Sequence, residues 1–136
     1  MPILQIISGK FIPLSPNNIG IAVLHPNILT VYELSGQYSN VSNKVTHYSL
    51  TNVYQHALGD EGKHFTAFSM ISGYFGGANQ NQNREMILVQ SLDGKIEIFE
   101  LSAHSFTRQF VDCLIPGPMA YLPRLDAFVH CGYTNR

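Results

Sequence analysis

Short runs of β-branched and aromatic residues, bounded by turn residues, recur along the chain, and helical periodicity is hard to find. The pattern predicts an all-β fold. The first half contains four expected strands, near Leu4–Ile12, Ile19–His25, Ile28–Leu34 and an interrupted Thr46–Leu58. The second half contains four more, at Phe68–Phe75, Glu85–Leu92, Lys95–Leu101 and Phe106–Ile115.

The two halves also repeat each other in sequence. Ile-Ser-Gly-Lys-Phe at 7–11 returns as Ile-Ser-Gly-Tyr-Phe at 71–75, and the run Leu29–Leu34 returns as Ile96–Leu101, 67 residues later. A third copy begins at Pro118–Leu122, turns at 123–126 and enters a strand at Ala127–Cys131. Self-similarity of this kind is typical of arrays whose units bury their apolar faces against their neighbours.

Two features of the copies predict blades of a β-propeller. Turn residues join the middle strands of each copy, at 25–27 and at 92–95, where Asp93-Gly94 suggests a type I′ turn. In Lys95–Leu101, Ile96 and Ile98 point to one face while Phe99 and Leu101 point to the other. A strand that is apolar on both sides must be covered on both sides, as stacked blades allow.

The expected fold is therefore an incomplete β-propeller, with two four-stranded antiparallel blades and the start of a third. We place the blades at 3–60 and 64–116 and the partial blade at 117–136, within one domain fragment over 1–136. Two blades and a fragment cannot close a ring, because propellers have about 4–8 blades. We expect the chain to be a piece of a longer protein or the product of a truncated gene model. Polar connections at 13–18, 35–43 and 76–83, the last rich in Asn and Gln, are expected to be surface loops.

Charge and composition exclude several classes of partner. Only 12% of the 136 residues are charged, the formal net charge is −1, and the basic residues are scattered, so no nucleic-acid partner is expected. The longest apolar run, Ile19–Leu24, is too short for a membrane helix, and the first residues do not resemble a signal peptide. Cys113 and Cys131 are expected to be free thiols in a reducing compartment.

No motif in the chain indicates catalysis, a cofactor or a metal, so no residue is assigned to any of these roles, and the partner interface is left open. Six histidines lack the spacing of zinc ligands: His25, His47, His56, His64, His104 and His130. Gly73, Gly76 and Gly77 lead to no helix start, as a phosphate-binding loop would require. Ser91–Gly94 is expected to be a plain hairpin turn, and Glu33 and Glu100, at equivalent strand ends, to serve the fold at the blade rim.

A propeller enzyme, either a hydrolase or a lyase, is the alternative, because its active-site residues could lie mostly in missing blades. Such a site would require titratable side chains on the innermost strands. The expected inner strands offer only a short set, Gln5, Ser8, Lys10, Ser69, Ser72 and Tyr74. We therefore favour a non-enzymatic interaction scaffold.

Several segments, in order along the chain, resemble the amino-terminal β-propeller of the Bardet–Biedl syndrome protein 9 (parathyroid hormone-responsive) family. They include residues 73–77 and 90–94, and Pro116–Tyr121 is the best single segment. The order and spacing of the segments together make the resemblance specific. The resemblance implies a subunit of the BBSome, a coat-like complex acting in ciliary membrane-protein trafficking and cilium assembly. It implies other BBSome subunits as partners, indirect association with ciliary membrane cargo, and no small-molecule substrate. It also implies a cytoplasmic location at the cilium and ciliary base, peripheral to the membrane.

Overall fold

The computed structural model describes residues 1–12, 19–38, 41, 44–59, 65–75, 84–100, 103–109 and 114–132, and the described residues form strands and connections without a helix. The all-β prediction is confirmed. The strands are β1 (Gln5–Gly9), β2 (Ile19–Leu24), β3 (Ile28–Tyr38), β4 (Val45–Ala57), β5 (Ala67–Gly73), β6 (Met86–Ser91), β7 (Lys95–Glu100), β8 (Ala103–Gln109), β9 (Leu114–Leu122) and β10 (Ala127–Gly132).

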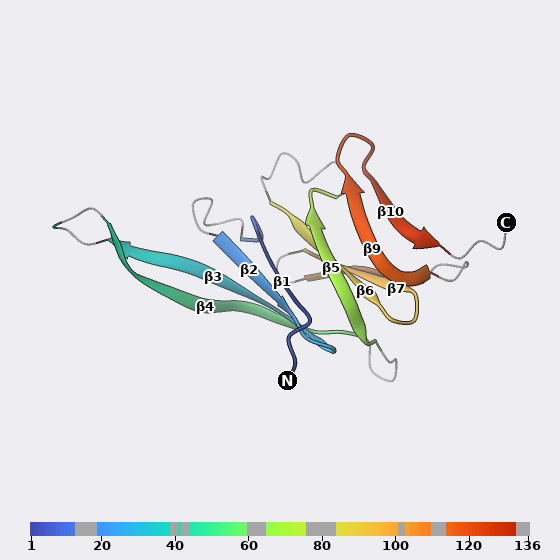
Figure 1. Cartoon of the computed structure of the whole chain (residues 1–136), viewed down its shortest axis with the longest axis horizontal. Coiled ribbons are helices and arrows are strands. Elements are labelled where there is room, and N and C mark those ends of the chain that lie inside the picture. Colours follow the sequence, from blue (N-terminus) through green and yellow to red (C-terminus); the bar gives the residue numbers. More distant parts are fainter. Residues whose placement is uncertain are drawn as a thin grey trace.

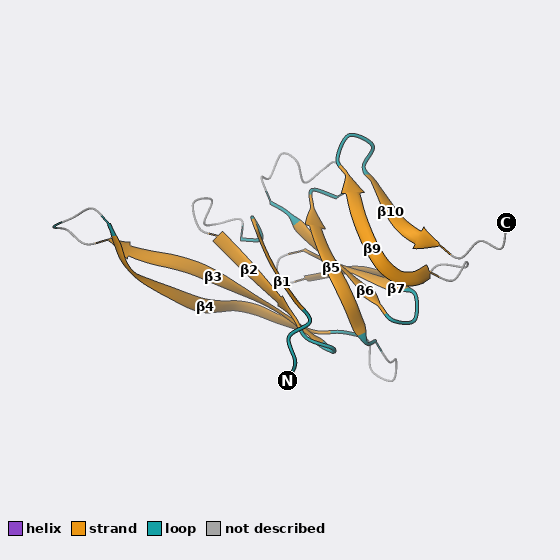
Figure 2. Ribbon diagram, in the orientation of Figure 1, coloured by secondary structure: helices purple, strands orange, loops and turns teal. Residues whose placement is uncertain are grey.

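These strands form three antiparallel sheets, in which each strand pairs with its neighbour in sequence (Figures 1 and 2). The first sheet has the order β1-β2-β3-β4, the second β5-β6-β7-β8, and the third consists of β9 and β10. The sheets approach one another through their first strands, since β5 contacts both β1 and β9. The described residues form a stack of sheets and not a closed ring.

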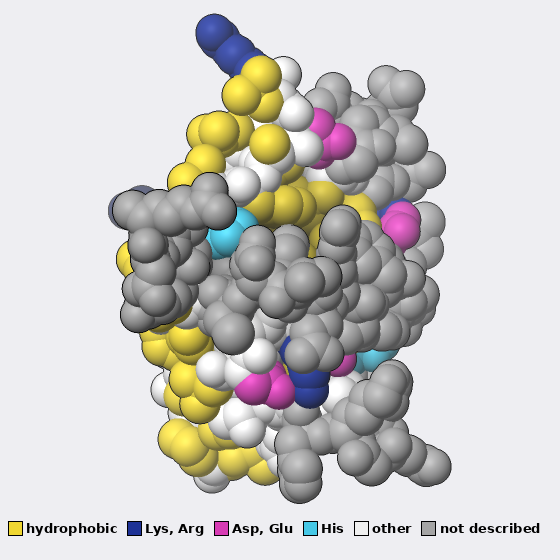
Figure 3. All heavy atoms as spheres, turned by 90° about the vertical axis from the view of Figure 1, so that its right-hand side faces the viewer, with side chains coloured by type: hydrophobic (Ala, Val, Ile, Leu, Met, Phe, Trp, Pro, Cys, Tyr) yellow, Lys and Arg dark blue, Asp and Glu magenta, His cyan; other side chains and the backbone are white. Residues whose placement is uncertain are grey.

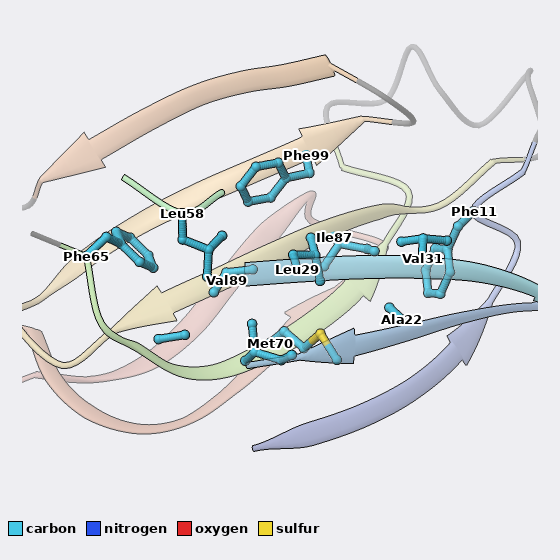
Figure 4. Packing of buried hydrophobic residues seen from close by; sticks show 12 residues of the cluster. Phe11, Ala22, Leu29, Val31, Leu58, Phe65, Met70, Ile87, Val89 and Phe99 are labelled. Carbon is cyan, nitrogen blue, oxygen red and sulfur yellow. The ribbon is translucent and has the colours of Figure 1, made fainter. Parts of the chain in front are cut away.

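Two apolar cores separate the three sheets. The first inter-sheet core lies between the first and second sheets (Figure 4) and contains Phe11, Ala22, Leu24, Leu29, Val31, Leu58, Phe65, Ala67, Met70, Ile87, Val89 and Phe99. The second inter-sheet core contains Phe75, Met86, Leu88, Ile96 and Ile98, against which Met119, Tyr121 and Phe128 of the third sheet pack. The second sheet is therefore covered on both faces, and all six residues of β6 are buried. This coverage explains why β7 is apolar on both sides.

The repeat is structural, but its spacing changes by one residue at the central hairpin. Four residues separate the paired Leu24 and Leu29, whereas five separate the paired Gln90 and Ile96. The extra residue lies in the second turn, where Gly94 has a φ of 83° and Asp93 does not have a positive φ. A type I′ turn requires positive φ at both central residues, so the predicted turn type is wrong.

The faces of β3 and β7 nevertheless correspond. Leu29 and Val31 lie in the first inter-sheet core, and Ile96 and Ile98, 67 positions later, lie in the second. Each pair thus faces the following sheet, as the echo between these segments predicts. The extra residue shifts the correspondence between β2 and β6 to 66 positions, so that Ala22 matches Leu88.

Most expected strands differ from the structure at their ends by one to three residues, and two predicted segments differ by more. The expected strand Phe106–Ile115 is wrong: β8 covers Ala103–Gln109, and Ile115 belongs to β9. The polar segment expected as a loop at 35–43 begins as strand, because β3 continues to Tyr38 and pairs with a β4 of 13 residues. The expected loops at 13–18 and 76–83 lie outside the described residues, as do Cys113 and His64. Cys131 lies in β10, but its side chain is not described.

Candidate functional site

The repeated Ile-Ser-Gly-x-Phe motif is a packing device. In each copy the Phe ring lies against the Gly two residues earlier. A Cβ atom on Gly9 would lie 2.8 Å from Phe11 Cζ, and one on Gly73 would lie 2.6 Å from Phe75 Cε1. Contacts this short exclude any side chain unless the ring moves. The motif therefore places one buried Phe at the end of each first strand, where it enters the core shared with the next sheet.

The residue between Gly and Phe in each motif also forms hydrogen bonds with the next sheet. Around Lys10, the Glu85 amide donates to the Lys10 carbonyl oxygen at 2.8 Å, and the Lys10 amide donates to Glu85 Oε2 at 2.7 Å. In the second copy the Tyr121 hydroxyl donates to the Tyr74 carbonyl oxygen at 2.8 Å. Both sets of bonds use backbone groups of the motif. The two copies therefore contact the next sheet at equivalent positions, although the contacting side chains of that sheet differ.

Polar side chains of β1 and β6 also join neighbouring sheets. The Gln5 amide makes two bonds to Met70 of β5: Nε2 donates to the Met70 carbonyl oxygen at 3.0 Å, and Oε1 accepts from the Met70 amide at 2.8 Å. In the second sheet Gln90 Oε1 accepts from Ser69 Oγ at 3.2 Å and from the amide of Gly117 at 3.4 Å. Of the predicted inner-strand set, Gln5 therefore bonds to the next sheet with its side chain, Lys10 and Tyr74 do so with backbone groups, and Ser69 bonds within its own sheet.

A cavity of about 310 Å³ lies between β5 and β9, next to the Gln5 contact. Its lining includes Phe68, Met70, Ile71, Gly117 and Met119 together with Ser69 and Gln5. The lining contains no acid, base or thiol, and the Ser69 hydroxyl already donates to Gln90. The described walls of this cavity therefore offer shape and apolar surface without acid–base chemistry.

Two buried charged residues were missed by the sequence analysis. Glu97 is 3% exposed on β7, and its Oε1 accepts from the Gly59 amide at 3.2 Å, across the first inter-sheet core. Arg84 is 8% exposed and forms an ion pair with Glu100. The position of Glu97, between two isoleucines of a strand covered on both faces, is the signal that could have identified it. The pairing of Glu100 agrees with the fold role expected for it.

Aromatic and histidine side chains in this region are also structural. His56 of β4 packs against Phe99 of β7, with ring centroids 4.9 Å apart, and against Tyr54 at 5.4 Å. Burial raises the pKa of Tyr54, and the nearby Arg84 charge opposes that shift. His25 lies in the first hairpin turn with Nδ1 2.8 Å from the Pro2 carbonyl oxygen. Within the described part of the chain, no group of three His, Cys, Asp or Glu side chains converges as metal ligands would.

The turn at Ser91–Gly94 is a hairpin connection, as predicted. The Ser91 hydroxyl donates to Asp93 Oδ1, the Lys95 amide donates to Ser91 Oγ at 2.9 Å, and Lys95 Nζ lies 2.9 Å from Asp93 Oδ2. The hydrogen bond from Ser91 makes the largest contribution to lowering the pKa of Asp93, and the Lys95 contacts lower it further. These bonds all remain within the turn, so its polar groups stabilise the reversal of the chain.

Exposed apolar surface remains on both outer sheets. On the first sheet, pairing and alternation place Ile6, Ile19 and Leu50 on the face turned away from the first inter-sheet core. On the third sheet Ile115, Leu122 and Val129 are exposed. Figure 3, which views the molecule from this side, shows hydrophobic side chains gathered along one edge with few charged ones among them. Such faces are candidate surfaces for further protein contacts. In the described residues, no helix is long and apolar enough to cross a membrane.

Comparison with known proteins yields one consistent family. The model of the PTHB1 N-terminal family matches residues 1–135. Protein PTHB1 of Xenopus laevis and that of Mus musculus are each 38% identical over 128 residues, and protein PTHB1 of Homo sapiens is 36% identical over the same length. The alignments cover 94% of this chain but only 13–14% of these relatives. The family resemblance predicted from the sequence is confirmed, since PTHB1 is also named BBS9.

Proposed function

Because this chain belongs to the PTHB1 N-terminal family, we propose that it supplies part of a non-enzymatic scaffold domain in a BBSome subunit. The role is ciliary membrane-protein trafficking and cilium assembly. One observation carries the proposal: polar side chains bind backbone groups of the next sheet, as Gln5 does at Met70 and Gln90 does at Gly117. Side chains used in this way build a surface for assembly and do not prepare a reaction.

The architecture we propose is a segment of a β-propeller, with one blade formed by β1–β4, a second by β5–β8, and a partial blade that begins with β9 at Leu114 and not at the expected position 117. Stacking of four-stranded antiparallel sheets through their first strands supports this arrangement. The repeated docking of Glu85 on Lys10 and of Tyr121 on Tyr74 supports it further, since each unit receives the next at an equivalent place. The exposed apolar face of the first sheet would be covered by another blade.

The alternative of a propeller hydrolase or lyase has no specific observation in its favour among the described residues. Two buried charged residues, Arg84 and Glu97, contact Glu100 and the Gly59 amide and so contribute to packing between and within sheets. The scaffold role instead implies other BBSome subunits as partners, with ciliary membrane cargo bound indirectly. It implies a cytoplasmic location at the cilium and ciliary base, peripheral to the membrane through the complex.

A segment exchange tests the proposal directly. In mouse PTHB1, the 128 aligned residues would be replaced by those of this chain, and the chimera would be expressed in ciliated cells that lack PTHB1. We expect the chimera to copurify with the other BBSome subunits and to restore delivery of a ciliary membrane receptor. A matched chimera carrying Val89→Asp, which places a charge in the first inter-sheet core, should do neither. A chimera that is soluble at normal levels but fails to copurify would contradict the scaffold role.

A further inference from the structure

The outermost strand of the first sheet is long and lies at an open edge. β4 runs for 13 residues and pairs only with β3 among the described strands. Pairing of β2 with β3 ends at Leu34, so that from Ser35 onward β4 is the one partner of β3 among the described residues. Figure 1 shows the resulting two-stranded arm projecting well beyond β1 and β2. The free side of β4 therefore presents a row of backbone N–H and C=O groups.

This edge lacks the charged and proline features that usually prevent strand pairing. From Val45 to Ala57 the chain contains no Asp, Glu, Lys, Arg, Pro or Gly. Exposed edge strands normally carry a charge, usually Lys, or a Pro that blocks an incoming strand. Here the side chains between His47 and Val53 are exposed, including Tyr48 at 66% and Leu50 at 57%. The inter-sheet cores cannot account for this sequence, since none of these seven residues belongs to them.

The second sheet supplies an internal comparison. Its outer strand, β8, occupies the same place as β4, but it has seven residues and includes Arg108. Two units with the same strand order thus differ in the length and charge of their outer strands. The long neutral edge is therefore a feature of the first unit and is not required by the shared supersecondary structure.

We propose that the β4 edge, defined as His47–Val53, binds an extended, uncharged segment of a partner protein by strand addition. From Asn52 to His47 the pairing of β4 with β3 is regular, and the alternating backbone donors and acceptors of such a strand are satisfied in register by another extended backbone. The edge has no Asp, Glu, Lys or Arg to pair with a charged segment. Its side chains alternate, with Tyr48 and Leu50 on one side and Ser49 and Thr51 on the other. An incoming strand that is apolar on one side and polar on the other matches it. This inference rests on the proposed scaffold role and assigns a docking surface to it.

The test measures binding of a defined strand to the natural full-length protein by fluorescence anisotropy. The probe is a fluorescein-labelled nonapeptide of alternating threonine and valine. Its control is the same peptide with N-methyl groups on alternate residues, which keeps the side chains but removes backbone donors. We expect saturable binding of the probe and at least about a tenfold weaker affinity for the N-methylated peptide, because several backbone hydrogen bonds are lost.

Matched protein variants locate the binding. The double substitution Ser49→Lys and Thr51→Lys charges the edge at two exposed positions and leaves the apolar side chains in place. The control, Leu92→Lys with Leu125→Lys, adds the same charge at exposed turn positions elsewhere. We expect the edge variant to lose at least about tenfold in probe affinity and the control to bind as the natural protein does. Equal melting temperatures would show that both variants are folded.

The outcomes separate the possible explanations. Absence of saturable binding, equal binding of the N-methylated peptide, or equal binding by the edge variant would each overturn the inference. Sedimentation of the natural protein and the edge variant gives a further outcome. Self-association that only the edge variant abolishes would assign the edge to a second copy of the chain and would overturn the partner proposal. None of these failures would affect the segment exchange, which tests the scaffold role separately.

Discussion

Phe99→Asp is expected to prevent folding, because Phe99 joins two sheets at the centre of the first inter-sheet core. Its side chain is 1% exposed, and its ring lies 4.9 Å from that of His56. Phe99 comes from β7 of the second sheet and His56 from β4 of the first, so the contact spans the interface. A charge at this position would face a neighbouring sheet and not solvent.

The expected loss of stability is much larger for Phe99→Asp than for Lys95→Asp, a change four residues earlier on the same strand. Truncating a buried Phe costs about 3–5 kcal/mol, and an unpaired buried charge adds several kcal/mol more. This sum approaches the whole stability of a typical domain, about 5–15 kcal/mol. Lys95→Asp removes an ion pair with Asp93, whose side chain is 52% exposed. Exposed pairs contribute about 0–1 kcal/mol, so this change should be tolerated.

Soluble yield and thermal unfolding of the full-length protein would measure the difference. Lys95→Asp should remain soluble with a melting temperature within a few degrees of the natural protein, while Phe99→Asp should be largely insoluble. Phe99→Leu, which keeps apolar volume, should lie between them and give a measurable melting transition. Similar yields and melting temperatures for Phe99→Asp and Lys95→Asp would show that Phe99 is not buried between sheets, and the stacked arrangement would then be wrong.

Three further predictions follow from the packing, the turn and the open faces. Gly73→Ala should cost about 1–3 kcal/mol, because its Cβ would lie 2.6 Å from Phe75 Cε1 and 2.6 Å from Tyr121 Cδ1. Phe75→Leu relieves the first of these contacts, so the double variant should be less damaging than the sum of the two, and additive losses in chemical denaturation would contradict this coupling. Asp93→Asn should destabilise the protein mainly above about pH 4, because Ser91 and Lys95 lower the folded pKa of Asp93. The contribution of the ionised Asp93 to stability is lost as pH falls through that pKa, so a pH-independent difference in unfolding free energy would contradict the prediction. The 136-residue chain expressed alone should form oligomers or aggregates through its exposed apolar faces, whereas a monomer peak in size-exclusion chromatography with one cooperative melt would show that the described sheets suffice.

The sequence alone determined the fold class, most strand positions and the two-sided burial of β7. Period-two alternation and turn residues are local signals, so they can be identified in the sequence without knowledge of tertiary contacts. The spacing of Ile96 and Ile98 from Leu29 and Val31 also identified equivalent faces, since one repeated unit presents the same side to its successor. The Ile-Ser-Gly-x-Phe echo showed the repeat, and the ordered family segments led to the family that the comparisons confirm.

Tertiary structure decided which residues meet across the sheets and where the register changes. Nothing local distinguishes the Gln5 amide, which binds Met70 of the next sheet, from an exposed glutamine, because its partner lies 65 positions away. The extra residue in the second hairpin is recognised only from the pairing of Gln90 with Ile96, because an Asp-Gly pair is compatible with more than one type of turn. Ile115 was assigned to the wrong strand because both sheets accept the same apolar pattern, and pairing with β10 alone identifies β9. Local patterns specify which residues form strands, whereas contacts between distant segments specify how those strands are combined.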